Sequence, residues 1–302
     1  MRTGLYIGGT LPVAQVLDRI RWAARAGLDS VFLDQVLGWD ALTVAAPAVR
    51  EIADIEVGTA VTHTFARHPI TLAQQALTIT AQGANRYALG LGPSHPHIVE
   101  GSYGLSYERP ARHVREYLSA LAPLLRGETV DYRGETLRAA GTVEVPAAAA
   151  PPVLVSALGP AMVKAAGELA DGAVTTWTTP GIIAEYIAPQ LSSAATAAGR
   201  PAPRIVAVVS AAVTADPDRL RQELARQWGP VSQLPSYRVL LDRQGLHGVH
   251  ETALLGSEDT VAEGFRAFEQ SGVTDPIVSA RGTAAEQERT RELVSRLRGG
   301  AR

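Results

Sequence analysis

Hydrophobic and polar positions along the chain follow two alternating periods, one helical and one typical of buried strands. Within residues 11–35, five apolar side chains recur at helical spacing and form one face: Val13, Val16, Leu17, Ile20 and Ala24. Gly27 follows where a C-terminal helix glycine is expected. The wholly apolar run 31–33 is typical of a strand buried on both faces. This stretch therefore predicts a helix followed by a buried strand.

The same order recurs along the chain. Residues 82–92, 168–177 and 270–280 each end a helix in small or polar residues and continue into a strand. Further strands are predicted at 2–8, 55–62, 152–157 and 204–213, and helices near 41–53, 69–82, 109–126, 160–170, 181–199, 257–271 and 283–298. About eight such units predict an α/β fold, a (β/α)8 TIM barrel formed by one domain over residues 1–302. A doubly wound open sheet is the competing interpretation.

Two regions interrupt this alternation. Residues 127–145 have short alternating pieces that predict a hairpin-like insertion, and the proline- and alanine-rich segment 146–152 is a connector. Residues 228–251 are rich in proline and glycine and predict short helices and loops over the barrel mouth. Insertions of this kind often form lids or substrate walls.

Composition narrows the function classes. The net charge of −2, without blocks of like charge, argues against nucleic acid as a partner. The chain has no cysteine, which excludes disulfides, thiolate metal sites and cysteine nucleophiles and suits a reducing cytoplasm. No segment approaches the ~20 apolar residues of a membrane span, and no signal-peptide pattern precedes the first strand. We expect a cytoplasmic protein that acts on a small molecule.

The predicted strand ends are poor in acids and rich in small residues and hydroxyls. Asp34 is the one obvious carboxylate, which argues against glycosidase-like hydrolysis by paired carboxylates. Residues 156–160, at a strand-to-helix turn, would direct backbone N–H groups at an anion, and Thr175 and Thr176 could add hydroxyl donors. Dinucleotide and nucleoside triphosphate motifs are absent from the sequence. A flat ligand with an anionic tail fits these strand ends.

Several side chains at the strand ends have more than one interpretation. His95, between two prolines, is either a proton donor or hydrogen-bond partner, or a structural loop histidine; its spacing to His97 matches no standard metal site. Asp34 is either functional or a strand-end cap or ion-pair partner of Arg67. Trp39 and Trp177 are candidates for a substrate wall or for the core. His63, Arg67 and His68 either contact the ligand or solvate a loop.

The residues also resemble a known family. The motifs "AGLDSVFLDQ", "VGTAVTHTFARHP", "RYALGLGPSHP", "YERPARHVREYL", "PVLVSALGPAM", "ELADGAVTTW" and "GSEDTVAEGFRAFEQSGVTD" are similar, in order, to the bacterial luciferase-like superfamily. Within it they resemble actinobacterial oxidoreductases that use the deazaflavin coenzyme F420. The resemblance covers nearly the whole chain. It implies a TIM barrel, a deazaflavin at its C-terminal face and a homodimer.

The resemblance assigns expected roles by position. Ala60 and Val61 match a bulge with a non-prolyl cis peptide behind the ring, while Asp34 and Trp39 match positions beside ring and substrate. The cofactor positions are Gly92, Pro93 and Ser94 along the ring edge, with His95 next to them, and Ser156, Ala157, Leu158, Gly159, Thr176 and Arg281 at the phosphate. Three positions depart from the sugar-phosphate dehydrogenase branch, where His, Glu and Lys stand in place of Gln35, His95 and Thr179. Oxidation of sugar phosphates is therefore not expected.

The reaction expected from this resemblance is hydride transfer between reduced deazaflavin and an electron-poor C=C or C=N bond. His95 is the candidate acid, Gln35 a candidate for orienting the substrate, and Asp34 lies beside them. An FMN-dependent monooxygenase and a noncatalytic flavin-binding protein are the two alternatives, and a metal hydrolase is a more distant one. The identity of the substrate is not encoded in any motif that we recognise.

Overall fold

Parallel strands close into a barrel in the computed structural model, which describes residues 2–83 and 85–297. In ring order they are β1 (Gly4–Ile7), β2 (Ser30–Leu33), β3 (Glu56–Thr59) continued by β4 (Thr62–His63), β5 (Tyr87–Gly92), β8 (Val153–Ser156), β9 (Gly172–Thr176), β10 (Arg204–Val213) and β12 (Asp275–Ala280). The pairings of β12 with β1 and of β10 with β9 close the ring. The predicted TIM barrel is confirmed, and the open doubly wound sheet is wrong.

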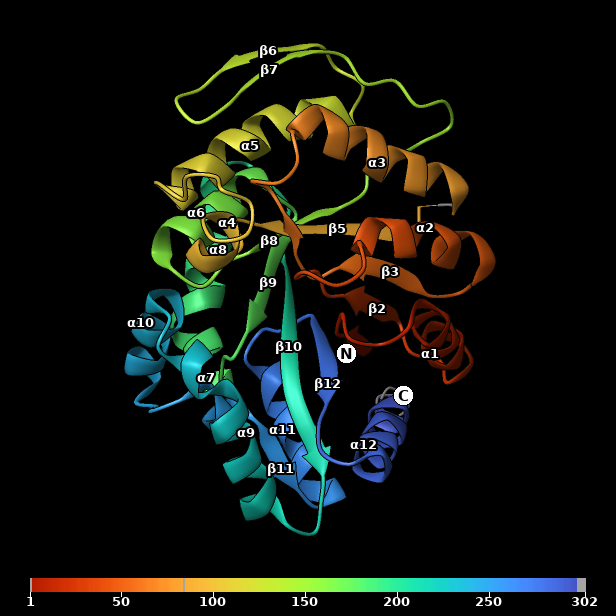
Figure 1. Cartoon of the computed structure of the whole chain (residues 1–302), viewed down its shortest axis with the longest axis vertical. Helices are drawn as coiled ribbons and strands as arrows, with labels where there is room; N and C mark the ends of the chain where they lie inside the picture. The colour runs from red at the N-terminus through yellow and green to blue at the C-terminus, as the bar shows by residue number, and fades with distance from the viewer. Residues whose placement is uncertain (1, 84, 298–302) are drawn as a thin grey trace.

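Helices cover the outside of the barrel (Figure 1). They are α1 (Val13–Arg25), α2 (Ala41–Glu51), α3 (Pro69–Gln82), α5 (Pro110–Leu125), α6 (Pro160–Leu169), α8 (Ala188–Ala197), α11 (Glu258–Gln270) and α12 (Ala284–Leu297). Short α7 (Pro180–Ile182) and the π-helical η1 (Ile183–Ile187) lead into α8. Gly27 has φ of 78°, as the C-terminal position of a helix requires. Position 298, the predicted end of the last helix, lies outside the described residues.

The barrel interior is filled by side chains from most of its strands. Phe32, Leu154, Val206 and Ile277 are buried there together with small residues such as Ala88. A Cβ at Gly58 would lie 2.5 Å from the Phe32 ring, so the glycine makes room for that ring. The interior is therefore a packed core, and any ligand has to bind at an end of the barrel.

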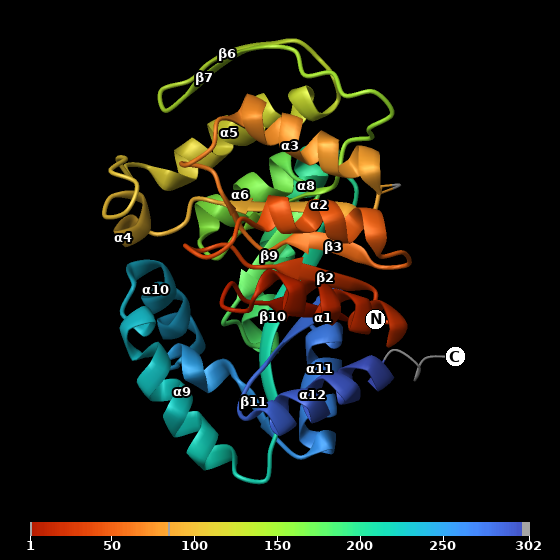
Figure 2. The ribbon, with the colours of Figure 1, turned by 45° about the vertical axis from the view of Figure 1, so that its right-hand side comes forward.

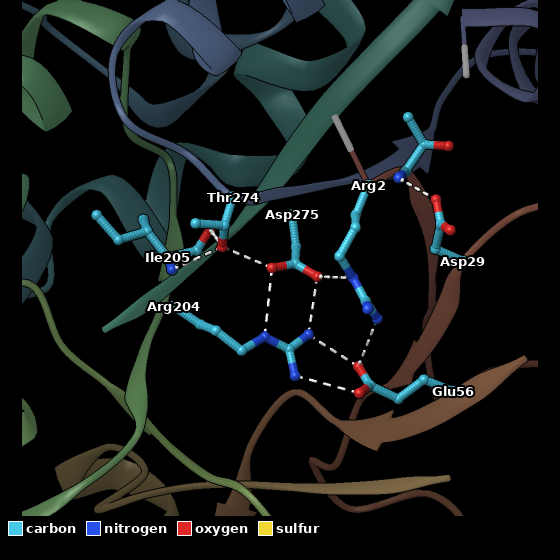
Figure 3. Close-up of polar contacts among 8 residues, drawn as sticks. Arg2, Asp29, Glu56, Arg204, Ile205, Thr274 and Asp275 are labelled. Atoms are coloured by element: carbon cyan, nitrogen blue, oxygen red, sulfur yellow. Dashed lines mark hydrogen bonds and ion pairs between the residues drawn. The ribbon is translucent and has the colours of Figure 1, made fainter. Parts of the chain in front are cut away.

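The N-terminal end of the barrel is closed by an ion-pair network (Figure 3). Arg204, at the start of β10, donates to both Glu56 oxygens at 3.1 and 2.8 Å and to both Asp275 oxygens at 2.8 and 3.3 Å. Arg2 adds a second cation to each of the two acids. Burial alone would raise the pKa of Asp275, but the hydrogen bonds and charge of Arg204 hold that pKa below its usual range. This network joins the starts of three strands.

The two predicted insertions occupy opposite ends of the molecule (Figures 1 and 2). Residues 127–145 form the antiparallel hairpin of β6 (Val130–Arg133) and β7 (Arg138–Gly141), as predicted, and it packs outside α3 and α5. The second insertion contains α9 (Pro217–Ser232), α10 (Pro235–Gln244) and η2 (Val249–Thr252), followed by β11 (Leu254–Gly256), which pairs with β10. It begins earlier in the chain than the predicted 228–251, because residues 217–227 already form the first turns of α9.

Candidate functional site

A cavity of about 660 Å³ opens at the C-terminal rim of the barrel. It lies between the strand ends, the short helix α4 (Pro96–Val99) and the insertion helices α9 and α10, and Figure 2 shows α4 and α10 projecting on the same side. Most of the side chains predicted for the site line it: Asp34, Gln35, Ala60, Val61, Pro93, Ser94, His95, Ser156, Leu158, Gly159, Thr175, Thr176, Trp177 and Arg281. The cavity is therefore the candidate functional site.

Three predicted residues lie elsewhere. Trp39 packs against the barrel core, and its indole N–H donates to the carbonyl of Leu11 at 3.1 Å. It does not line the cavity, which corrects the prediction that it forms part of a substrate wall. Ala157 is fully buried beneath the rim. Gly92 has to lack a side chain, because a Cβ there would lie 2.7 Å from Val61 and 2.9 Å from Ser156. This glycine lets β5 approach its neighbours closely.

The strand at Ala60 and Val61 carries the predicted bulge. Gly58 pairs with Ala88 and Thr62 with Leu91, so three residues of one strand face two of the other. The side chain of Thr59 fills the gap, since its hydroxyl donates to the carbonyl of Gly90 at 2.7 Å and accepts from the N–H of Gly90 at 3.0 Å. The prediction of a cis peptide at this bulge is wrong, because the described residues contain no cis peptide bond. The hydroxyl bridge already satisfies the backbone groups that the bulge displaces.

His95 caps the short helix α4 and points toward the insertion. Its Nε2 lies 3.0 Å from the hydroxyl of Tyr237 on α10, and its ring stacks on His97 with centroids 5.7 Å apart. Burial, and then the charge of His97, lowers the pKa of His95. The preceding residue, Ser94, has φ of 64°, and its carbonyl accepts a 2.7 Å hydrogen bond from Tyr107. The loop is therefore held by tyrosines from two sides as well as by its prolines.

Asp34 directly follows β2 and lies beside Tyr6 and Arg281. Burial raises its pKa, against the hydrogen bond from Tyr6 and the charge of Arg281. The expected alternative of an ion pair between Asp34 and Arg67 is wrong, because Arg67 pairs with Asp40 at the start of α2. With its amide oxygen facing Arg67, Gln35 accepts hydrogen bonds from both terminal nitrogens at 3.0 and 3.1 Å. Asp34 thus remains directed at the cavity.

Of His63 and His68, only His63 lines the cavity. His63, at the end of β4, lines the cavity and lies 3.4 Å from the hydroxyl of Tyr103. Burial, followed by the charges of Arg67 and His95, lowers its pKa to about 4. His68 instead caps α3 and contacts the carbonyl of Arg138 in the hairpin, outside the cavity lining.

The turn after β8 faces the opposite side of the cavity. Ser156, Leu158 and Gly159 lead into α6, and a Cβ at Gly159 would meet no atom within 4 Å. Arg281 was expected beside this turn, but it follows β12, which β9 and β10 separate from β8. Its guanidinium lies 4.7 Å from the centre of the Trp228 ring and faces Asp34 and Tyr6. Arg281 is therefore separated from this turn, and its assignment to the anionic tail stays a prediction.

Sequence reasoning missed four lining residues that define the site. Tyr6 is the last residue but one of β1, Tyr107 precedes α5, and Tyr237 and Arg243 belong to α10. Arg243 lies 4.5 Å above the ring of Tyr186, on the same wall as the turn after β8. Gln244 anchors α10 by accepting from the N–H of Thr179 at 2.8 Å. Only Tyr6 could have been found, since it occupies a strand end; the α10 residues meet the rim through tertiary packing.

Trp177 joins the barrel wall to the insertion. It has φ of 53°, an unfavourable conformation for a bulky residue, and such outliers cluster at functional sites. Its ring packs edge-on against Tyr237, with centroids 4.5 Å apart, and lies 6.1 Å from Trp228. Trp177 is thus part of an aromatic cluster that joins the end of β9 to α9 and α10, and its role as a substrate wall stays a prediction.

Across residues 2–83 and 85–297, no three or more His, Cys, Asp or Glu side chains gather closely enough to hold a metal ion. Over the same residues, no helix combines the length and apolar character needed to cross a bilayer.

Comparisons with known proteins agree with this geometry. The family model of luciferase-like monooxygenases matches residues 2–275. A 5,10-methylenetetrahydromethanopterin reductase of Methanolobus tindarius is 26% identical over 89% of this chain and 82% of its own length. An F420-dependent glucose-6-phosphate dehydrogenase of Mycolicibacterium fortuitum is 32% identical, but the match spans 62% of this chain and only 58% of that relative. The F420-dependent tetrahydromethanopterin reductase of Methanopyrus kandleri has the same fold, with a TM-score of 0.82 at 22% identity over 97% of both chains.

Proposed function

We propose a function from the premise that this chain belongs to the family of luciferase-like monooxygenases. It is an oxidoreductase that binds coenzyme F420 in the rim cavity and reduces an electron-poor C=C or C=N bond of a small organic substrate. Support comes from curated relatives whose names specify F420-dependent enzymes. The observation that carries the proposal is a cavity in which a wall of small side chains, the N-terminus of α6 and titratable side chains meet.

The described residues fit a planar coenzyme with a phosphate-bearing tail. The bulge at Ala60 and Val61 and the close approach at Gly92 form a wall of small side chains and backbone. Open space at Gly159, where α6 begins, would admit an anion to the helix N-terminus. Thr176 and Ser156 add hydroxyls beside that turn, and Arg243 adds a cation. When bound, the deazaflavin supplies the hydride acceptor or donor.

The protein contributes position and proton transfer. His95 would deliver a proton to the reduced substrate through Nε2, and the hydroxyl of Tyr237, 3.0 Å away, would orient the ring and exchange the proton. Because its lowered pKa leaves His95 largely neutral near neutral pH, the protonated ring that can give up a proton is more populated at lower pH. Asp34, whose pKa burial raises, is a second proton-holding group in the cavity lining.

The wall formed by α9 and α10 excludes water and favours a polarised substrate. Trp177, Trp228 and Leu240 are apolar neighbours of the space above the rim. Arg281 places a positive charge beside this space. A cation next to a carbonyl or similar group would withdraw electrons from a conjugated double bond, which makes that bond a better hydride acceptor.

Titration of the cofactor-free protein with F420, and separately with FMN, tests the proposal. We expect F420 to bind and FMN to bind far less tightly. In turnover with reduced F420 and a panel of cyclic enones and imines, His95→Gln should lower kcat about 100-fold while the Kd for F420 stays unchanged. His247→Gln, an exposed histidine outside the cavity, is the matched control.

The alternatives give different results in the same assays. Preferential FMN binding with oxygen uptake would replace the proposal with a monooxygenase. Tight F420 binding without turnover on any acceptor would indicate a noncatalytic binding protein. The homodimer implied by the family resemblance remains a prediction, which sedimentation of the purified protein checks.

A further inference from the structure

A second cavity, of about 260 Å³, lies behind the rim between β1, β12, α1 and α12. Its polar lining consists of Thr10, Arg19, Ser279, Arg281, Gln287 and Arg291. Tyr6 and Arg281 line both this cavity and the large rim cavity, so they form a shared wall. The proposed cofactor and substrate positions do not otherwise involve this space.

The second cavity is rich in positive charge. Three arginines line it, and neither aspartate nor glutamate does. Arg291 is buried and pairs with Glu288, whose side chain is about half exposed. Arg19 is half-buried, and within the described part of the chain it forms no hydrogen bond or ion pair. The buried Nε of Arg281 is also without a hydrogen-bond partner.

Such an arrangement is electrostatically costly in the absence of an anion. Two carboxylates lie near these three guanidiniums, Glu288 beside Arg19 and Arg291 and Asp34 beside Arg281, but neither carboxylate lines the cavity. Burial, and then the charge of Arg291, lowers the pKa of Arg19, while the charge of Glu288 opposes this shift. Buried cations are normally paired or hydrogen-bonded, so among the described residues Arg19 and the Nε of Arg281 lack a partner that an anion in the cavity would supply.

We propose that this cavity binds a phosphate dianion, free or as a phosphate monoester, between Arg19, Arg281 and Arg291. The planar guanidinium fork suits the oxygens of a phosphate, and the hydroxyl of Ser279 and the amide of Gln287 supply further donors. The small volume favours a compact anion over a nucleotide. This binding is independent of F420.

Calorimetric and 31P NMR titrations of the cofactor-free protein with inorganic phosphate test the proposal, at constant ionic strength set with chloride. We expect saturable binding of one phosphate, and about tenfold weaker binding in Arg19→Gln, because a charge-assisted hydrogen bond to phosphate is lost. Arg25→Gln is the matched control, since Arg25 lies on the same helix but is exposed and outside the cavity. It should bind phosphate like the wild type.

A parallel titration with glycerol 3-phosphate distinguishes the two sources of the dianion. Tighter binding of the monoester would identify an esterified ligand, and tighter binding of inorganic phosphate would identify the free ion. Arg291→Gln is a second variant, with circular dichroism confirming its fold. The proposal is overturned if the wild type shows no saturable binding of either anion, or if Arg19→Gln and Arg25→Gln bind phosphate equally.

Discussion

The two ends of the barrel hold charged residues in opposite situations. At the N-terminal end, Arg204 is paired with both Glu56 and Asp275, and each acid has a further contact with Arg2 (Figure 3). At the C-terminal end, Asp34 and Arg281 face each other without a direct ion pair in the described structure. Both ends are built from strand termini, so secondary structure alone does not account for the difference.

The difference separates stability from function. Charges at the N-terminal end satisfy one another, and their pKa values move in the direction that favours the charged forms. At the C-terminal rim, burial moves the pKa values of Asp34, His63 and His95 toward their neutral forms. Groups held away from their preferred charge state are typical of sites that bind and react. Three predictions test this contrast, in order of decreasing effect.

The largest effect is expected from Arg204→Met. The substitution leaves Glu56 and Asp275 near each other with Arg2 as their remaining cation, and Asp275 is only 1% exposed. Breaking a buried pair from one side typically costs about 3–5 kcal/mol, which is the expected loss in the free energy of unfolding measured by urea denaturation. F420 affinity at the remote rim should be retained.

The control for this prediction is an exposed pair. Arg133→Gln breaks the contact with Asp131 on the hairpin, where both side chains are mostly exposed, and should leave stability unchanged. A comparable loss in both variants would show that the N-terminal network is no more important than a surface pair, and the contrast between the two barrel ends would fail.

The sequence predicted local structure well because the signals were local. The range of α3, 69–82, and that of β10, 204–213, follow from apolar periodicity and from the prolines and glycines that bound them. The rim residues were located by one rule, that barrel sites form at strand C-termini. That rule placed His95, Ser156 and Thr176 in the cavity without any knowledge of packing.

What the sequence could not predict depends on contacts between distant segments. Arg204 meets Glu56 across 148 positions, and Tyr237 meets His95 across 142. No period or motif relates such pairs, because the barrel closure and the position of α10 bring them together. Trp39 shows the opposite error. Its position after β2 predicted a site residue, but the indole bonds to Leu11 and packs against the barrel core.

A smaller effect is expected from the pH dependence of stability at the rim. His63 titrates near 6.5 when unfolded and about 4 when folded, so between these values protons bind preferentially to the unfolded chain. The contribution of His63 to the free energy of unfolding is therefore complete above pH 6.5 and is lost as the pH falls toward 4. The gap between the two pKa values corresponds to about 3 kcal/mol.

Urea denaturation at a series of pH values checks this prediction. His63→Gln should flatten the decline in the free energy of unfolding between pH 6.5 and 4, although His95 and His113, whose pKa values are also lowered by burial, keep part of it. His247→Gln should retain the full decline. An unchanged decline in His63→Gln would mean that this histidine is solvated in the folded protein.

The smallest effect is expected from Tyr237→Phe, which deletes one hydroxyl and keeps the aromatic wall. The ring still packs against Trp177, so the cavity shape and F420 affinity should persist. Loss of the hydrogen bond to His95 should lower kcat about tenfold, as expected for about 1.4 kcal/mol. Because the pKa of His95 is lowered, the wild-type rate of reduction should fall as the pH rises through a value below 6.5. If Tyr237→Phe changes KM for the substrate and leaves both kcat and this pH profile intact, the hydroxyl only shapes the pocket, and the rim would owe its reactivity to Asp34 instead.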